Sequence, residues 1–217
     1  YGPQHLYDVQ IDLMRRSELV DRREFRFGFR TIEIEQKKDA AGASFRWIVN
    51  GVPVWIRGAN WIPVDSMIPR DHDSRTRKLV ELACDANMNC LRVWGGGVYE
   101  SNLFYDLCDE LGVLVWQDFM FACGTYPEHR AYAESVRLEA EDNIRRLRHH
   151  PSLAFWCGNN ENDWAYDVGW KGFHDHGGLM GRIYYHKLLP DLCRVLDPHR
   201  FYWPSSPFGS FKPNGQH

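Results

Sequence analysis

The sequence contains no long apolar run and no excess of one charge. A helix that crosses a bilayer needs about 20 consecutive apolar residues, and the apolar runs here are far shorter. We therefore expect a soluble protein with no membrane partner. The formal net charge is −3, which gives no reason to expect nucleic acid as a partner. No signal peptide is visible and the chain does not begin with Met, so the sequence leaves the cellular compartment unknown.

Motifs for metals and nucleotides are also scarce. The six cysteines form no Cys-x-x-Cys pair, which argues against zinc or thioredoxin-type sites. Most cysteines fall in apolar patterns, so we predict buried free thiols. No Gly-x-Gly-x-x-Gly follows a predicted strand, which weakens a dinucleotide-binding interpretation. His174 and His176 resemble a metal pair, but they lie in a Gly-rich stretch. We predict no metal and no cofactor.

Aromatic residues, in contrast, are abundant, with 9 Trp, 10 Tyr and 12 Phe. Several of the tryptophans stand beside Gly, Asn or Pro, where loops are expected. Indole rings in such places suit stacking on the C–H faces of sugars. Aromatic rings are equally good core material, so composition alone does not decide between these roles.

The N-terminal segment reads as antiparallel β-structure. Alternating apolar residues predict half-buried strands at Val9–Leu13 and Ile32–Ile34, separated by a polar stretch at 17–23. A third strand at 45–49 runs into Asn50-Gly51, a strong hairpin signal. Residues 37–44 read as a linker. These strands are typical of the end of a β-sandwich, which needs about seven strands in all.

From Val54 onward, short apolar strands alternate with amphipathic helices. Strands are predicted at 54–57, 90–93, 113–116, 153–156 and 201–203. Helices are predicted at 74–87, 101–111, 133–148 and 183–196. Asp73 is the expected N-cap of the first helix, Gly112 the stop of the second, and Pro190 a kink or restart in the fourth. The alternation predicts an α/β fold with a parallel sheet.

A doubly wound sheet and a β/α barrel both fit this alternation. Polar and aromatic residues crowd the carboxyl end of every predicted strand, which favours the barrel, because a β/α barrel builds its active site there. A complete barrel has eight strands and roughly 250 residues. We therefore expect a piece of a larger protein. Residues 1–43 would be the last strands of the sandwich domain with a linker, and 44–217 the first five or so βα units of a TIM barrel.

The sharpest motif is Trp156-Cys157-Gly158-Asn159-Asn160-Glu161-Asn162-Asp163. An apolar strand leads directly into Asn160 and Glu161. A barrel glycosidase needs a carboxylic acid that protonates the glycosidic oxygen and a partner for the sugar 2-hydroxyl. The alternative is an ordinary helix N-cap, for which Asn and Asp are common.

This segment resembles the acid/base signature of the β-mannosidases of glycoside hydrolase family two. Further segments resemble that family in the expected order along the whole chain. They are Phe27-Gly28-Phe29-Arg30-Thr31-Ile32-Glu33, Asn50-Gly51 through Asn60-Trp61-Ile62-Pro63, Asp85-Ala86-Asn87-Met88-Asn89, Leu91-Arg92-Val93-Trp94-Gly95-Gly96-Gly97-Val98-Tyr99-Glu100 and Val115-Trp116-Gln117-Asp118-Phe119-Met120-Phe121-Ala122-Cys123. β-Galactosidases and β-glucuronidases of the family carry His-Tyr-Pro where this chain has Trp94-Gly95-Gly96-Gly97.

The resemblance implies a retaining exo-β-mannosidase that removes terminal non-reducing β-D-mannose, with an immunoglobulin-like domain before the barrel. Glu161 would be the acid/base and Asn160 would bind the 2-hydroxyl. Trp94 would form a wall of the sugar subsite, with the glycines after it letting backbone approach the ligand, or else it would only plug the top of the barrel. The nucleophile of the family comes from the seventh barrel strand, which this chain lacks.

Four further positions carry an alternative beside their implied role. Asp118 would accept hydrogen bonds from sugar hydroxyls, or else form a structural ion pair with Arg92. Three tryptophans would line the pocket or pack in the core: Trp61, Trp170 and Trp203.

The expected partners are a mannose-containing oligosaccharide or glycoside and the rest of the barrel with its N-terminal domains. Three other functions stay open. They are another exo-glycosidase of the same family, of β-galactosidase or β-glucuronidase type, a non-catalytic carbohydrate-binding remnant, and a metal-dependent barrel hydrolase.

Overall fold

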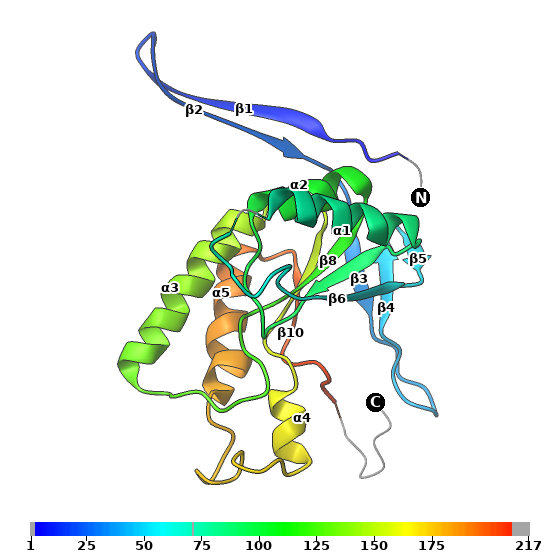
Figure 1. The fold of residues 1–217 in the computed structure, drawn as a ribbon, viewed down its shortest axis with the longest axis vertical. Helices are drawn as coiled ribbons and strands as arrows, with labels where there is room; N and C mark the ends of the chain where they lie inside the picture. Colours follow the sequence, from blue (N-terminus) through cyan, green and yellow to red (C-terminus); the bar gives the residue numbers. More distant parts are fainter. Residues whose placement is uncertain (1–2, 71, 210–217) are drawn as a thin grey trace.

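The computed structural model describes residues 3–70 and 72–209 and is built on a five-stranded parallel sheet (Figure 1). The strands lie side by side in chain order: β6 (Gly58–Trp61), β7 (Cys90–Val93), β8 (Leu114–Asp118), β9 (Leu153–Cys157) and β10 (Phe201–Trp203). The segments between them form α1 (Asp73–Asp85), α2 (Asn102–Leu111), α3 (Arg130–Leu147), α4 (Asn162–Asp167), a π-helical turn (Tyr184–Leu188) and α5 (Leu189–Leu196). The predicted α/β class with a parallel sheet is confirmed.

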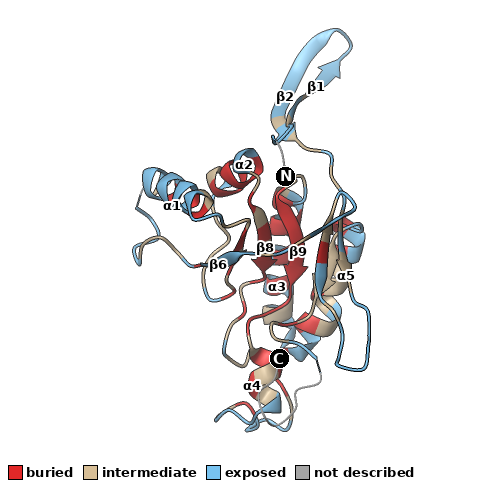
Figure 2. Cartoon of the chain, turned by 90° about the vertical axis from the view of Figure 1, so that its right-hand side faces the viewer, coloured by how far each residue is buried: buried red, intermediate tan, exposed pale blue. Residues whose placement is uncertain are grey.

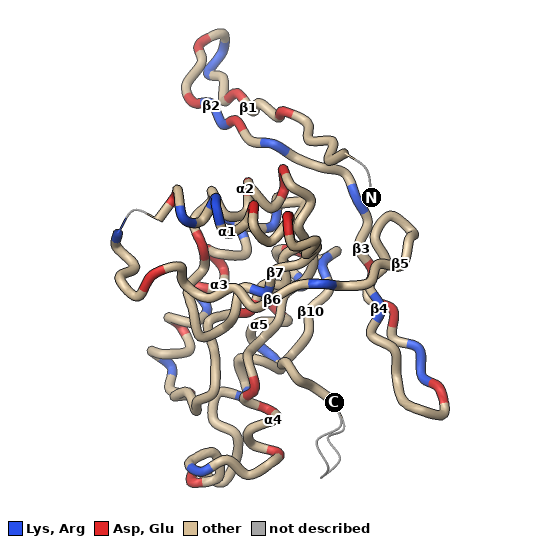
Figure 3. The backbone as a smooth tube through the Cα atoms, turned by 45° about the vertical axis from the view of Figure 1, so that its right-hand side comes forward, with Lys and Arg blue, Asp and Glu red and all other residues tan. Residues whose placement is uncertain are grey.

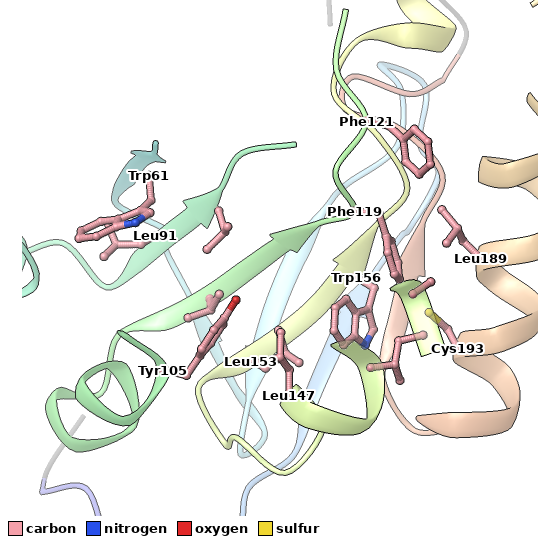
Figure 4. Packing of buried hydrophobic residues seen from close by; sticks show 14 of the residues in the cluster. Trp61, Leu91, Tyr105, Phe119, Phe121, Leu147, Leu153, Trp156, Leu189 and Cys193 are labelled. Carbon is pink, nitrogen blue, oxygen red and sulfur yellow. The ribbon is translucent and has the colours of Figure 1, made fainter. Parts of the chain in front are cut away.

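The main core lies between one face of the sheet and the helices. Trp156 of β9 is fully buried and stacks on Phe119, with ring centroids 5.2 Å apart. Leu147 of α3 and Leu189 of α5 are buried in the same cluster (Figure 4). All five residues of β9 are buried, which explains why this strand is apolar without alternation.

Most helix ends follow the sequence signals. Gly112 ends α2 in the left-handed conformation at φ 72°, where glycine has no Cβ penalty. Pro190 lies in the first turn of α5, directly after the π-helical turn, so the irregularity falls where the sequence predicts a kink or restart. The expected N-cap of α1 is wrong by one residue, because His72 occupies that position and Asp73 is the first helical residue.

A three-stranded antiparallel sheet packs against the other face. It consists of β3 (Ile32–Glu35), β4 (Arg46–Val49) and β5 (Val52–Val54), in that order. Asn50 and Gly51 have φ of 50° and 76°, as the predicted tight hairpin turn requires. Trp47 of β4 is buried and lies 5.1 Å from Phe155 of β9, centroid to centroid. Because β3 pairs with β4 (Glu35 opposite Arg46), sheet pairing runs across residue 43, and the division into two domains stays a prediction.

The first strand of the parallel sheet was predicted at 54–57, and this is wrong. Val54 pairs with Trp47 in the hairpin, and the parallel strand begins at Gly58. A Cβ at position 58 would lie 2.0 Å from the carbonyl oxygen of Cys90. The strand therefore forms where glycine permits close approach to β7, although it has no apolar run.

A long antiparallel hairpin of β1 (Tyr7–Arg15) and β2 (Glu18–Phe27) projects from the body (Figures 1 and 2). Strand β2 was missed because the segment is mostly polar. Strand β1 was predicted to be half-buried, but Ile11 and Leu13 are 55% and 60% exposed. Acidic and basic residues are interspersed along the hairpin (Figure 3), and Arg22 pairs with Asp12 at 2.7 Å.

Arg30 joins the hairpin region to the start of β9. Its Nε donates to the carbonyl of Pro151 at 2.9 Å and its Nη2 to that of Leu153 at 2.7 Å.

None of the helices within residues 3–70 and 72–209 is both long and apolar enough to cross a bilayer.

Candidate active site

The carboxyl ends of three neighbouring strands stay together beyond the sheet. Parallel bridges join Ala122 to Asn160 and Asn160 to Ser206. The loops after β8, β9 and β10 therefore lie side by side. Asn160 and Glu161, far in sequence from the other two loops, come to the middle of this rim.

Glu161 stands at the turn between β9 and α4. Its backbone has φ 66°, a left-handed conformation that is uncommon for a residue with a side chain. Its N–H donates to the carbonyl of Ser206 at 3.0 Å. The residue occupies the N-cap position of α4, but its side chain makes no cap hydrogen bond. Strained residues of this kind gather at functional sites, where the surrounding structure holds them.

The capping role falls to Asn159 instead. This fully buried side chain accepts a hydrogen bond from the Asn162 N–H at 2.9 Å and one from the Ser205 hydroxyl at 2.7 Å. The two adjacent asparagines thus differ. Asn159 holds the loop in place, while Asn160 faces the polar groups of the rim.

Asn160 is only 6% exposed and contacts side chains from two other strand ends. Arg92 of β7 donates from Nη2 to its Oδ1 at 3.0 Å. Its Nδ2 donates to Sγ of Cys123 at 3.3 Å, and that thiol donates to Oε2 of Glu161 at 3.4 Å. These bonds connect Arg92, Asn160, Cys123 and Glu161 into one polar chain.

Asp118, at the end of β8, is fully buried and forms the predicted ion pair with Arg92. Arg92 donates to both of its oxygens, at 3.2 Å and 2.8 Å. The indole N–H of Trp116 and the backbone N–H of Gly95 add bonds of 2.8 Å and 3.0 Å. Burial raises the pKa of Asp118, and the bonds from Arg92, Gly95 and Trp116 oppose that rise. A carboxylate has about four acceptor positions, so these donors fill the capacity of Asp118.

Trp94 lies half-buried at the rim. Its ring leaves no room for a side chain at one of the three glycines that follow it. A Cβ at Gly96 would come within 2.0 Å of the Trp94 ring. A Cβ at Gly95 would lie 2.5 Å from the carbonyl oxygen of Phe121. The sequence suggested that these glycines let backbone approach a ligand, but at both positions the close neighbour belongs to the protein.

The other three tryptophans lie in different surroundings. Trp61 is 7% exposed, contacts Phe104 and donates its indole N–H to Glu100 at 2.8 Å, which are the contacts of a core residue. Trp203, half-buried at the end of β10, lies against Phe45 and Phe201. Trp170 follows α4, is 37% exposed and packs edge-on against Trp164 of that helix. Of the three, Trp170 presents the most surface.

The histidine pair of the Gly-rich stretch does not form a ligand group. His174 contacts the carbonyl of Tyr166 at 2.7 Å and stacks on its ring. Among the described residues, one group could offer three ligand atoms to a metal: Asp106, Asp109 and His150, away from the rim. His150 Nδ1 is already 2.6 Å from Asp109, which also accepts from the Ser152 N–H.

The sequence analysis proposed Asn160, Glu161 and Asp118 as site residues, and it did not foresee the contacts of Cys123 with Asn160 and Glu161. The cysteines were expected to be buried thiols, and Cys90, Cys108, Cys157 and Cys193 are buried and free. Cys123 is exposed. Partial desolvation of the thiol and the adjacent Glu161 carboxylate raise its pKa. The available signal was its place after β8, at the same sheet edge as Asn160.

Comparison with known proteins gives matches over the whole chain, although no family model matches it. β-Mannosidase B of Aspergillus fumigatus is 43% identical over 221 residues, which covers 98% of this chain and 26% of that protein. The β-D-mannosidase structure from Dictyoglomus thermophilum superimposes with a TM-score of 0.94 at 48% identity, covering 100% of this chain and 26% of that one. A β-glucuronidase from Parabacteroides merdae follows with a TM-score of 0.72 and 25% identity, covering 92% and 24%.

These matches relate the chain to the β-glycosidases of glycoside hydrolase family two. More particularly, it corresponds over its length to a segment of the β-mannosidases, so the resemblance seen in the motifs is confirmed. The chain spans about a quarter of the length of the curated relatives it matches.

Proposed function

We propose that this chain is the acid/base-carrying part of a retaining exo-β-mannosidase that removes terminal non-reducing β-D-mannose. The observation that supports it most is Glu161. Its side chain lies at the carboxyl edge of a parallel sheet beside Asn160 and is not used to cap a helix. The names of the matched relatives support mannose as the sugar.

In the proposed reaction, Glu161 first donates a proton to the glycosidic oxygen as the aglycone leaves. The same carboxylate then accepts a proton from the water that releases the sugar from the enzyme. Asn160 binds the 2-hydroxyl, whose hydrogen bond strengthens in the transition state. Trp94 and Trp170 provide ring surface at the rim, and Asp118 acts by holding Arg92 against Asn160.

We infer that the nucleophile of the proposed reaction comes from another part of the parent protein. It must be a carboxylate about 5–5.5 Å from the acid/base. Three carboxylates that stand at or just after the ends of β7, β8 and β9 each have a partner within the protein. Asp118 binds Arg92, Glu100 accepts from Trp61, and Asp163 contacts His186 at 2.7 Å.

The architecture proposed for the parent protein follows from the same relation. Residues 44–217 would be the first five βα units of a TIM barrel, and residues 1–43 the last strands of an immunoglobulin-like domain with a linker. The five parallel strands in chain order fit the first units of a barrel. The exposed apolar side chains of β1 fit a sandwich whose other strands are supplied elsewhere.

The acid/base role is tested with Glu161→Ala in the full-length parent protein. An alkyl β-mannoside needs protonation of its leaving group, whereas a dinitrophenyl β-mannoside does not. We expect kcat/KM to fall by about 10²–10⁴-fold on the alkyl substrate, the range of general acid catalysis, and far less on the dinitrophenyl one. Azide should restore part of kcat, because it attacks the glycosyl-enzyme without a general base.

The control for this test is Glu81→Ala, which changes an exposed glutamate on α1 and should leave both substrates unaffected. Equal losses on the two substrates with no azide rescue would show that Glu161 is structural.

The sugar preference is tested separately with the wild-type parent. We expect kcat/KM to be highest on aryl β-mannoside when the aryl β-galactoside and β-glucuronide are compared under the same conditions. A higher value on either of the other two sugars would reassign the enzyme within the family. Loss of all activity after metal chelation would instead favour a metal-dependent hydrolase.

A further inference from the structure

Hydrogen bonds at the rim have a direction that is set by Arg92. A guanidinium group can only donate, so the atom of Asn160 that faces Arg92 at 3.0 Å is the amide oxygen. The amide nitrogen must then face Cys123, and it donates to Sγ at 3.3 Å. Since the sulfur accepts there, its own hydrogen is available to Glu161 Oε2, 3.4 Å away.

The backbone fixes the thiol in this place. The N–H of Cys123 donates to the carbonyl of Asn160 at 3.1 Å, and the N–H of Asn160 donates to the carbonyl of Phe121 at 2.9 Å. Cys123 also has φ 48°, a conformation that costs energy for a residue with a Cβ. The loop after β8 is thus held to the loop after β9 at Cys123 itself and two residues before it.

We propose that Cys123 is a positioning residue that orients the carboxyl group of Glu161. The thiol holds Oε2 in both the protonated and the ionised form of the glutamate, so Oε1 is the oxygen that delivers the proton to the glycosidic oxygen and later takes one from water. Without the thiol, the carboxyl group rotates about its last torsion and spends less time aligned. This inference rests on the proposed acid/base role of Glu161.

The test compares Cys123→Ala and Cys123→Ser in the full-length parent on two substrates. On an alkyl β-mannoside, Cys123→Ala should lower kcat/KM by about 3- to 10-fold, the value of one modest hydrogen bond. On a dinitrophenyl β-mannoside it should change by less than about 2-fold, because no proton is needed. Cys123→Ser keeps a donor and an acceptor, so it should recover most of the alkyl activity.

The matched control is Cys84→Ala, a partly buried cysteine on α1, which should leave the ratio of the two kcat/KM values at the wild-type value. Equal losses on both substrates, or no loss on either, would overturn the positioning role. A serine variant as impaired on the alkyl substrate as the alanine variant would also overturn it.

Running Glu161→Ala on the same substrates separates the two hypotheses. If Glu161→Ala shows the leaving-group dependence and Cys123→Ala does not, only the positioning role fails. If Glu161→Ala shows none, the acid/base role fails as well.

Discussion

The side chain of Asn160 has hydrogen-bonding capacity left after its contacts within the protein. An amide oxygen has two lone pairs and the amide nitrogen two hydrogens. Arg92 takes one lone pair and Cys123 one hydrogen. One acceptor and one donor position therefore stay available, which is what a sugar hydroxyl requires.

For Asn160→Ala in the full-length parent, we expect kcat/KM on aryl β-mannoside to fall by about 100-fold, mainly through kcat. The bond to the 2-hydroxyl strengthens in the transition state and is worth several kcal/mol there. Steady-state kinetics measure the effect, with Asn102→Ala on α2 as the control. A rise in KM with kcat unchanged would mean that Asn160 binds only the ground state.

For single residues, the sequence indicated which ones follow a strand end better than it indicated which side chains they contact. Glu161 and Asn160 were found because they follow an apolar strand directly. The bond from Ser205 to Asn159 and the contact of Cys123 with Asn160 join loops 37 or more residues apart that meet only in the folded chain. Local patterns do not carry that information. For Asp118, the sequence named both the sugar contact and the ion pair, and the ion pair is present.

Among the elements, the rim turn after β7 gives Trp94 its place. Gly95 donates to Asp118 and lies against the loop after β8, while Gly96 lies under the Trp94 ring. The turn therefore joins the ring of Trp94 to the buried ion pair of Arg92 and Asp118 through a short stretch of backbone.

Substituting Gly96→Ala should displace the Trp94 ring, since the new Cβ would lie 2.0 Å from it. We expect kcat/KM of the parent enzyme to fall by about 10- to 100-fold, because small displacements in a binding site have large effects on rate. The melting temperature should change little. Gly178→Ala is the control, since its Cβ would enter open space. Unchanged kinetics in Gly96→Ala would remove Trp94 from the proposed sugar subsite.

The strands predicted most accurately were the buried ones, because burial requires apolar residues. β7 and β9 were placed to within one residue, because buried parallel strands must be apolar. β6 and β2 were misplaced or missed, since the first is fixed by the close approach of Gly58 to Cys90 and the second is an exposed, mostly polar strand. In segments that are not buried, the hydrophobic pattern of the sequence gives little information about where a strand lies.

For the whole molecule, the described surface carries several exposed apolar side chains. Tyr7, Ile11 and Val20 of the β1–β2 hairpin are each 55–56% exposed. The parallel sheet has β6 and β10 as its edge strands, and unpaired strand edges promote association between chains. Trp55, 82% exposed, adds a large apolar side chain near the start of the sheet.

Residues 1–217 expressed alone should therefore associate and show no glycosidase activity. The exposed apolar side chains and the open sheet edges give the physical reason for association. The chemical reason is that the proposed reaction needs a nucleophile besides Glu161. Asp118, Glu100 and Asp163, which stand at or after other strand ends, are paired with Arg92, Trp61 and His186. Size-exclusion chromatography with light scattering measures the first property, and an aryl β-mannoside assay at high protein concentration measures the second. A monodisperse monomer with turnover that Glu161→Gln abolishes would contradict both expectations and would place a nucleophile within these residues.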